Sequence, residues 1–156
     1  MKLTVSIDAK NLEGRLAELR AKLDDCSEGM RIVGEEIAAH ARRAFTNPEK
    51  RPAPWPPLAE STVKARKRKG RSGTAPLVDS GTLARSPRVV QVTKNSVTVA
   101  SDRAENGHSL AAIHQFGTKN GRIPARAFFP IEGNGFTAKV AKEITETFGK
   151  WLLGAE

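Results

Sequence analysis

The sequence predicts an α+β fold: a small, mostly antiparallel sheet packed by two N-terminal helices and a C-terminal helix. Apolar residues recur at helical spacing near both ends of the 156-residue chain. In the middle, apolar and polar residues alternate on either side of a short turn, which is the pattern of an antiparallel hairpin. Because helical and strand patterns are segregated along the chain, an alternating α/β arrangement is disfavoured.

The N-terminal segment predicts a strand followed by a helix. Residues 2–7 alternate between apolar and polar side chains, which is the period of a half-buried strand. Leucines then recur at spacings of four, three and four residues, with Asp8 or Asn11 available as the helix cap. They form one narrow apolar stripe that we expect to be a packing face: Leu12, Leu16, Leu19 and Leu23.

A second amphipathic helix is predicted from Ser27, as its N-cap, to Phe45, ending before Pro48. The two helices meet at residues 25–27 either as a helical hairpin or as one long bent helix. Ser27 and Gly29 favour a break, because serine and glycine weaken a continuous helix.

Residues 46–58 contain five prolines and predict an extended arm, since such density forbids both helix and sheet pairing. Trp55 in this arm has two interpretations: it packs against its own domain, or it docks on a neighbouring subunit. A short helix then follows from Leu58 to Lys67. We expect the basic, glycine-containing stretch at residues 67–76 to be a mobile loop.

The chain is predicted to re-enter the core through residues 77–83, where Asp79 or Ser80 caps a single helical turn. A hairpin follows, with its turn at residues 94–96. The alternating apolar residues of its two strands are Val90, Val92, Val97 and Val99. Residues 101–109 read as a polar loop.

Two apolar segments are expected to close the sheet. In the segment 111–118, Ile113 and Phe116 are expected in the core, and Gly117 turns the chain sharply away. The segment 123–130 carries two further phenylalanines and ends on a proline that stops any regular ladder. A last helix is predicted from apolar residues at steps of three or four: Phe136, Val140, Ile144, Phe148 and Trp151 or Leu152.

Length and composition fit a single domain over residues 1–156, including the proline-rich arm 46–58 and the basic loop 64–76. Aromatic residues make up only 5% of the chain, so we expect a lean core that draws part of its stability from neighbouring subunits. The single cysteine, Cys26, is expected to be structural and points to a reducing compartment. No apolar run approaches a transmembrane length, so we expect a soluble protein.

The positive charge is concentrated in one segment. The formal net charge is +9, and residues 42–71 carry ten Lys and Arg against two Asp and Glu. Dense cations attract polyanions without reading sequence, so a small basic nucleic-acid-binding module is the alternative function. Its candidate contacts are Lys64, Arg66, Lys67, Arg68, Lys69 and Arg71. Since no aromatic residue interleaves this run to stack bases, a solvated or protein-facing surface is the competing interpretation.

No catalytic constellation is evident. Asp79, Ser80 and His114 supply the residue types of a hydrolase triad, but Ser80 lacks the strand-turn-helix context of a nucleophile. The three histidines and the cysteine have no metal-ligand spacing: His40, His108, His114 and Cys26. We therefore expect no enzyme activity, no cofactor and no metal site.

Three segments carry a family resemblance. They are WPPLAESTVKARKRKG at residues 55–70, LVDSGTLARS at 77–86 and AAIHQFGTKNGRIPARAFF at 111–129. On these segments the chain resembles the tailed-bacteriophage virion morphogenesis family, also called tail completion proteins. The terminal helices match by general pattern only. The resemblance implies a structural protein of the phage or prophage tail, made in the bacterial host cytoplasm and without enzymatic activity.

The resemblance also implies how such a protein works. It implies a ring-forming subunit, with a hexamer expected, that caps the tail tube and helps to join it to the head. The implied partners are copies of itself, the tail tube and the head-tail connector proteins. Candidate interface residues carried over from the motif, together with the arm tryptophan, are Trp55, His114, Gln115, Phe116, Arg126 and Phe128. Ala127 stands where such motifs commonly carry proline.

Overall fold

The computed structural model describes residues 9–70, 73–105 and 107–154, and the predicted strand at residues 2–7 lies outside them. The helices are α1 (Ala9–Asp24), α2 (Ser27–Arg43), α3 (Glu60–Arg68), α4 (Thr82–Arg85), α5 (Leu110–Phe116) and α6 (Ala138–Leu153), with one 3-10 turn, η1 (Pro48–Lys50). The strands are β1 (Arg88–Val92), β2 (Val97–Ala100), β3 (Ala104–Glu105), β4 (His108–Ser109), β5 (Ile131–Glu132) and β6 (Gly135–Phe136). The predicted α+β class is confirmed.

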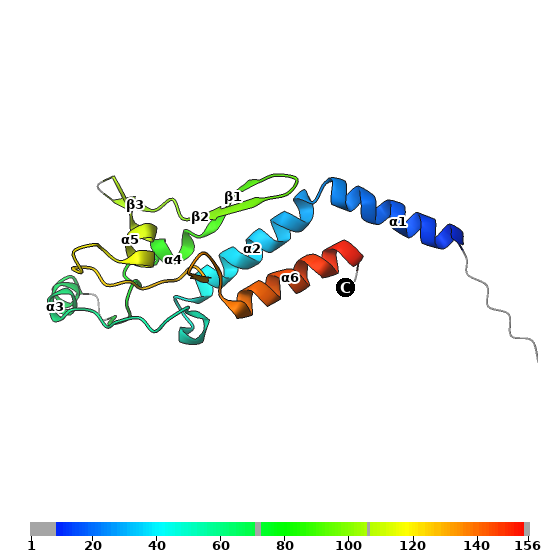
Figure 1. Ribbon diagram of the computed structural model, residues 1–156. Coiled ribbons are helices and arrows are strands. Elements are labelled where there is room, and N and C mark those ends of the chain that lie inside the picture. Colours follow the sequence, from blue (N-terminus) through cyan, green and yellow to red (C-terminus); the bar gives the residue numbers. More distant parts are fainter. Residues whose placement is uncertain (1–8, 71–72, 106, 155–156) are drawn as a thin grey trace, which may run out of the picture.

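Helix α2 is the central element of the fold. It lies between the β1–β2 hairpin on one side and α6 on the other (Figure 1). Its buried face includes Val33, Ile37 and Ala41. The hairpin approaches closely at Gly34, where an added Cβ would lie 2.5 Å from the Cγ2 atom of Val97. Glycine at this position therefore lets the helix and the hairpin pack directly against each other.

The predicted hairpin is confirmed. Strands β1 and β2 pair antiparallel, with Arg88 opposite Ala100 and Val92 opposite Val97. The register shifts between Val89 and Gln91, which is a β-bulge. The polar loop 101–109 contains the short β3–β4 ladder, so the strands in the described ranges form three separate two-stranded ladders, β1–β2, β3–β4 and β5–β6.

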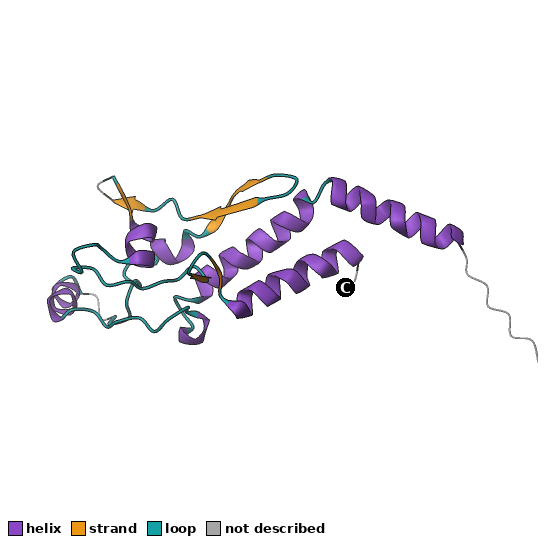
Figure 2. Cartoon of the chain, in the orientation of Figure 1, coloured by secondary structure: helices purple, strands orange, loops and turns teal. Residues whose placement is uncertain are grey.

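The expectation that two apolar segments close the sheet is wrong. The first, at residues 111–118, is mostly helix α5, whose N-cap Ser109 accepts a hydrogen bond from the Ala112 amide at 3.3 Å. The second, at residues 123–130, has no regular secondary structure until the bend before β5. Long loops of this kind fill the end of the molecule around α3 and α5 (Figure 2).

The break between the first two helices is confirmed, but its cap differs from the prediction. Ser27 is the first residue of α2, and Cys26 occupies the N-cap position without a side-chain cap hydrogen bond. The Asp25 carboxylate accepts the Ser27 amide hydrogen bond at 3.0 Å instead. Helix α1 leads away from the body rather than folding back on α2, so the two separate helices do not form a hairpin (Figure 1).

The expected packing face of α1 is largely uncovered. Three leucines of the stripe are more than half exposed: Leu12 at 54%, Leu16 at 55% and Leu23 at 58%. Helix α1 contacts the body near its C-terminal end, where the Lys22 ammonium donates a hydrogen bond to the Trp151 carbonyl at 2.7 Å. A narrow leucine stripe predicts a helix–helix contact, and among the described residues Leu19 is the one leucine of the stripe that is half-buried.

The main core lies where the C-terminal end of α2 meets the proline-rich arm and the segment before β5. It is built from Ala41, Ala44, Phe45, Trp55, Leu83, Ala111 and Phe128. The Phe45 ring lies 5.5 Å from Trp55 and 5.0 Å from Phe128, centroid to centroid. Such edge-on and tilted aromatic pairs contribute beyond the area they bury.

Three smaller predictions are corrected. Gly81, with φ 72°, occupies the N-cap of α4, so neither Asp79 nor Ser80 does. Val78 is 37% exposed instead of entering the core. Phe136 lies in β6, before α6 begins.

Within the described ranges, no helix has the length and apolar character needed to cross a membrane.

Candidate assembly surface

The chain turns sharply at Gly117, directly after α5. Its φ of 75° is in the region that favours glycine, and an added Cβ would lie only 3.0 Å from the Ala125 nitrogen and the Ile123 oxygen. The turn is closed by the Thr118 amide, which donates to the Ile123 carbonyl at 2.9 Å. The corner predicted at this glycine is therefore present, and it brings residues 123–130 back against α5.

Gln115 fastens the returning segment to α5. Its buried carboxamide oxygen accepts hydrogen bonds from the backbone amides of Phe128 and Phe129, both at 3.0 Å. Its Nε2 group donates to the Phe129 carbonyl at 3.2 Å. Side-chain hydrogen bonds thus replace the ladder that the sequence analysis expected here, which explains how the segment can be ordered without being a strand.

Arg126 connects the same segment to the proline-rich arm. Only 6% of the residue is exposed, and its Nε and Nη2 groups donate to the carbonyls of Pro56 at 2.8 Å and Pro57 at 2.7 Å. The indole Nε1 of Trp55 donates to the Ala127 carbonyl at 2.7 Å. Of the two alternatives for Trp55, the structure shows the first, because the ring lies in its own subunit's core.

Four of the six candidate interface residues are therefore used inside the subunit. Trp55, Gln115, Arg126 and Phe128 are each less than one tenth exposed. In the folded chain their side chains hold the arm and the returning segment together and offer little surface to a partner.

The other two candidates are His114, which is half-buried, and Phe116, which overturns an expectation. The sequence analysis places Phe116 in the core, but the residue is 75% exposed at the last position of α5. Gln115, its neighbour, takes the inward position on this short helix. Phe116 therefore adds a large apolar side chain to the surface of the subunit.

His114 lies between the interior and a pocket. Its Nδ1 atom is buried and has no hydrogen-bond partner among the described residues. Burial lowers the pKa of His114 below its ordinary value near 6.5, and the positive charge of Arg126 lowers it further. The imidazole is thus held in its neutral form near pH 7.

The pocket beside His114 has a volume of about 850 Å³, and cations outnumber anions among its charged lining residues. It is bordered by the arm, α3, the residues before α4 and the turn after α5. Its charged lining comprises Arg66, Arg103, Arg122 and Arg126 against Asp79 and Glu105. Two of these guanidinium groups, those of Arg66 and Arg126, already donate to backbone carbonyls of the chain.

The pocket does not assemble the hydrolase triad considered above, although Asp79, Ser80 and His114 all line it. A triad histidine uses both ring nitrogens, one toward the acid and one toward the nucleophile. His114 Nδ1 has no partner among the described residues, and the Ser80 hydroxyl lies 2.9 Å from the Thr82 hydroxyl.

In the basic segment, Arg66 makes contacts within the chain, whereas the other described cations of α3 and its C-cap are exposed. Arg66 donates to the carbonyls of Gly73 at 3.1 Å and Ala75 at 2.9 Å and pairs with Asp79 at 3.7 Å. The exposed cations of α3 and its C-cap are Lys64, Lys67, Arg68 and Lys69. Arg71 lies outside the described residues. The helix extends through Arg68, so the start of the loop predicted at residues 67–76 is helical.

The structure also brings together a cluster that the sequence analysis did not anticipate: Glu36, His40 and Glu143. Glu36 and His40 stand four residues apart on α2, a spacing in the sequence that could have indicated a shared helix face. Glu143 comes from α6, which the sequence does not place nearby. Their arrangement is considered below.

In a comparison with known protein families, residues 7–153 match the sequence profile of the phage virion morphogenesis family. The chain belongs to that family. The match confirms the resemblance and extends it from the central motifs to the helices at both ends. This family member is therefore a structural protein of phage particle assembly and a component of the virion. Neither a search of curated proteins nor one of solved structures finds a significant match.

Proposed function

We propose that this family member completes the phage tail. It binds the end of the tail tube as a ring of identical subunits, with six expected, and presents that ring to the head-tail connector proteins. It acts by contact and performs no catalysis. The family match over residues 7–153 carries the proposal, together with the apolar surfaces that the subunit leaves uncovered.

The uncovered surfaces lie at the two ends of an elongated subunit. Helix α1, with its leucine stripe, projects at one end, and α5, which ends at Phe116, lies toward the other (Figure 1). A contact between two different surfaces of identical subunits is head-to-tail, and such contacts close into a ring when the rotation allows. We therefore place a second copy of this chain on the α1 stripe.

The spacing of the leucines supports that occupant. Steps of four, three and four residues are the a and d positions of a heptad, the seam along which one helix packs on another. A lone helix of 16 residues is marginal in water without such packing. A helix of a neighbouring subunit would supply the missing partner.

Sizing and imaging test the proposal. Tag-free protein is examined by size-exclusion chromatography with light scattering, and by negative-stain microscopy alone and with tails from a phage lacking its coding sequence. We expect rings, either free or formed at one end of the tubes, and unjoined heads and tails in the deletion phage. Protein that stays monomeric with and without tubes, or a deletion phage with joined infectious particles, would refute the function.

A second candidate, contact with the DNA backbone, is favoured by the exposed cations of α3 and its C-cap. Binding through phosphate contacts falls with salt, with a slope of about 0.9 for each phosphate neutralised. If this segment touches DNA, replacing Lys67, Arg68 and Lys69 with glutamine lowers that slope by about 2.7. Lys142→Gln, on α6, is the matched control and leaves it unchanged.

An unchanged salt slope in the triple variant removes DNA contact from this segment. If virion assembly is unchanged in the same variant, Lys67, Arg68 and Lys69 play no part in assembly either.

A further inference from the structure

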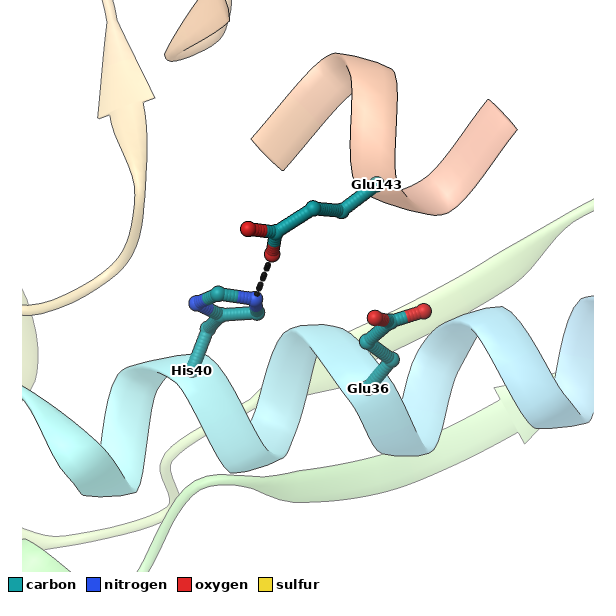
Figure 3. A group of neighbouring side chains, drawn as sticks. All are labelled: Glu36, His40 and Glu143. Atoms are coloured by element: carbon teal, nitrogen blue, oxygen red, sulfur yellow. Dashed lines mark ion pairs between the residues drawn. The ribbon is translucent and has the colours of Figure 1, made fainter. Parts of the chain in front are cut away.

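Three side chains with metal-binding chemistry converge between α2 and α6, away from the assembly surface. Glu36 and His40 are four residues apart and therefore share one face of α2. Glu143 projects from α6 toward that face, and both α2 side chains point toward it (Figure 3). One nitrogen and two carboxylate oxygens, one from each residue, all lie within 4.8 Å of one another.

Two members of the cluster are already in contact. His40 is 2% exposed, and its Nε2 atom lies 2.6 Å from a Glu143 carboxylate oxygen. The pair connects α2 to α6 through an ionisable group at the centre of the packed helices. The Glu143 side chain is 32% exposed, so this member of the cluster is in contact with solvent.

Glu36 supplies the second, independent observation. Its Oε2 atom is buried and has no hydrogen-bond partner among the described residues. An unpaired buried carboxylate oxygen costs free energy, because it loses its hydration without gaining a substitute. A cation bound between Glu36 and Glu143 would remove that cost.

We propose that Glu36, His40 and Glu143 form a binding site for one divalent transition-metal ion, with Zn²⁺ as its occupant, and that the ion fastens α2 to α6. The proposal is independent of the assembly function, since it concerns the opposite side of α2 from the hairpin. It rests on the convergence of the three ligands and on the unpartnered oxygen.

The chemistry of the ligands selects this class of ion. An imidazole nitrogen together with carboxylate oxygens suits zinc, whereas magnesium and calcium prefer oxygen ligands alone. Two carboxylates around a neutral imidazole balance the charge of a divalent ion. Three protein ligands leave the fourth tetrahedral position for water.

The distances require only a local adjustment. Tetrahedral zinc ligands at 2.0–2.2 Å from the metal are about 3.3 Å apart. The His40–Glu143 contact of 2.6 Å would therefore lengthen slightly, and Glu36 would move inward by rotation of its flexible side chain. No helix has to shift, because the ligands already lie within 4.8 Å.

The test is a titration of tag-free, chelator-treated protein with ZnCl₂, followed by calorimetry and by thermal unfolding. We expect one bound zinc per chain and a Tm that rises by about 8 °C at zinc about 100 times above its Kd. Co²⁺, used as a probe, should give the visible absorption of a tetrahedral site.

Matched variants locate the site. Glu36→Gln keeps the shape of the side chain, and Oε2 of Glu36 has no hydrogen-bond partner among the described residues to lose, so the variant protein should fold. We expect this variant to bind zinc at least about tenfold more weakly than the unchanged protein. Glu35→Gln, next in sequence with its side chain 59% exposed, should bind zinc like the unchanged protein. His108→Gln controls for an exposed histidine and should also have no effect.

His40→Gln should abolish the cobalt spectrum. The proposal is overturned if zinc leaves the Tm unchanged, if Glu36→Gln binds zinc as tightly as Glu35→Gln, or if His108→Gln is the variant that removes binding. In each case the cluster is a hydrogen-bonded helix contact only.

Discussion

The guanidinium of Arg126 is buried against backbone carbonyls instead of a carboxylate. The guanidinium donates to the carbonyls of Pro56 and Pro57 in the arm, and the backbone amide of Arg126 donates to the His114 carbonyl at 2.6 Å. Burial lowers the pKa of Arg126 from its very high ordinary value. Arginine nevertheless keeps its charge in proteins, so the side chain remains a donor for both carbonyls.

His114 makes the stability of the subunit depend on pH. Its pKa is lowered in the folded chain, so the unfolded chain binds a proton more readily as pH falls below about 6.5. The stability linked to His114 is therefore complete above that pH and is lost as pH falls through the lower, folded-state pKa. We expect His114→Gln to show a smaller drop in Tm between pH 7.5 and pH 5.5 than the unchanged chain.

Thermal unfolding at a series of pH values measures this effect. His108→Gln, which alters an exposed histidine on β4, should keep the full pH dependence. If His114→Gln retains the same drop in Tm, the linkage to His114 is refuted.

At the scale of elements, α2 organises the body and α1 lies outside it. Helix α2 packs against the hairpin at Gly34 and against α6, where Gly29 lets the Trp151 ring approach so closely that an added Cβ would lie 2.4 Å from it. Helix α1 also carries an apolar stripe, but among the described residues it contacts α6 near its C-terminal end and leaves Leu12, Leu16 and Leu23 more than half exposed. The two helices therefore differ in how far their apolar faces are covered.

The uncovered stripe of α1 predicts a variant with a clear signature. Leu16→Glu places a charge in the proposed seam, where it would be desolvated, so we expect assembly to be lost. The subunit itself should keep its Tm at low concentration, because Leu16 is 55% exposed there.

Size-exclusion chromatography with light scattering measures the assembly state. Ala21→Glu adds the same charge to an exposed position on the opposite face of α1 and should assemble normally. Equal assembly of the two variants would show that α1 is not the contact.

At the scale of the whole molecule, the main core cluster is small and lies at the C-terminal end of α2. Seven residues form it, and apolar side chains that are more than half exposed lie on α1, at the end of α5 and at the end of α6. A subunit of this kind gains stability when identical neighbours cover those surfaces.

Stabilisation of the subunit by identical neighbours predicts a Tm that depends on protein concentration. Over a hundredfold rise in concentration, mass action favours an assembled folded state by about 2.7 kcal/mol, which corresponds to about 8 °C for a chain of this size. Scanning calorimetry at increasing concentration tests it, and Leu16→Glu should remove the dependence. A constant Tm in the unchanged chain would show that free subunits do not self-associate.

Local patterns sufficed to predict much of this fold. The leucine stripe, the alternation around residues 94–96 and the apolar steps of the last helix each depend on neighbours in sequence. Helices α1, α2 and α6 and the β1–β2 hairpin were therefore predictable, as were the corner at Gly117 and the family motifs. The same short-range reasoning failed at residues 111–130, where an apolar run does not distinguish helix, strand and loop.

By itself, the sequence determined the helical and strand periods, the sharp turn, the location of the charge and the family. The tertiary structure alone decided which apolar faces are covered, because burial depends on elements far apart in the chain. It turned Phe116 outward and Gln115 inward, placed Trp55 in its own subunit and left the α1 stripe open. It also brought Glu143 to Glu36 and His40 across about a hundred residues, a proximity that no local pattern encodes.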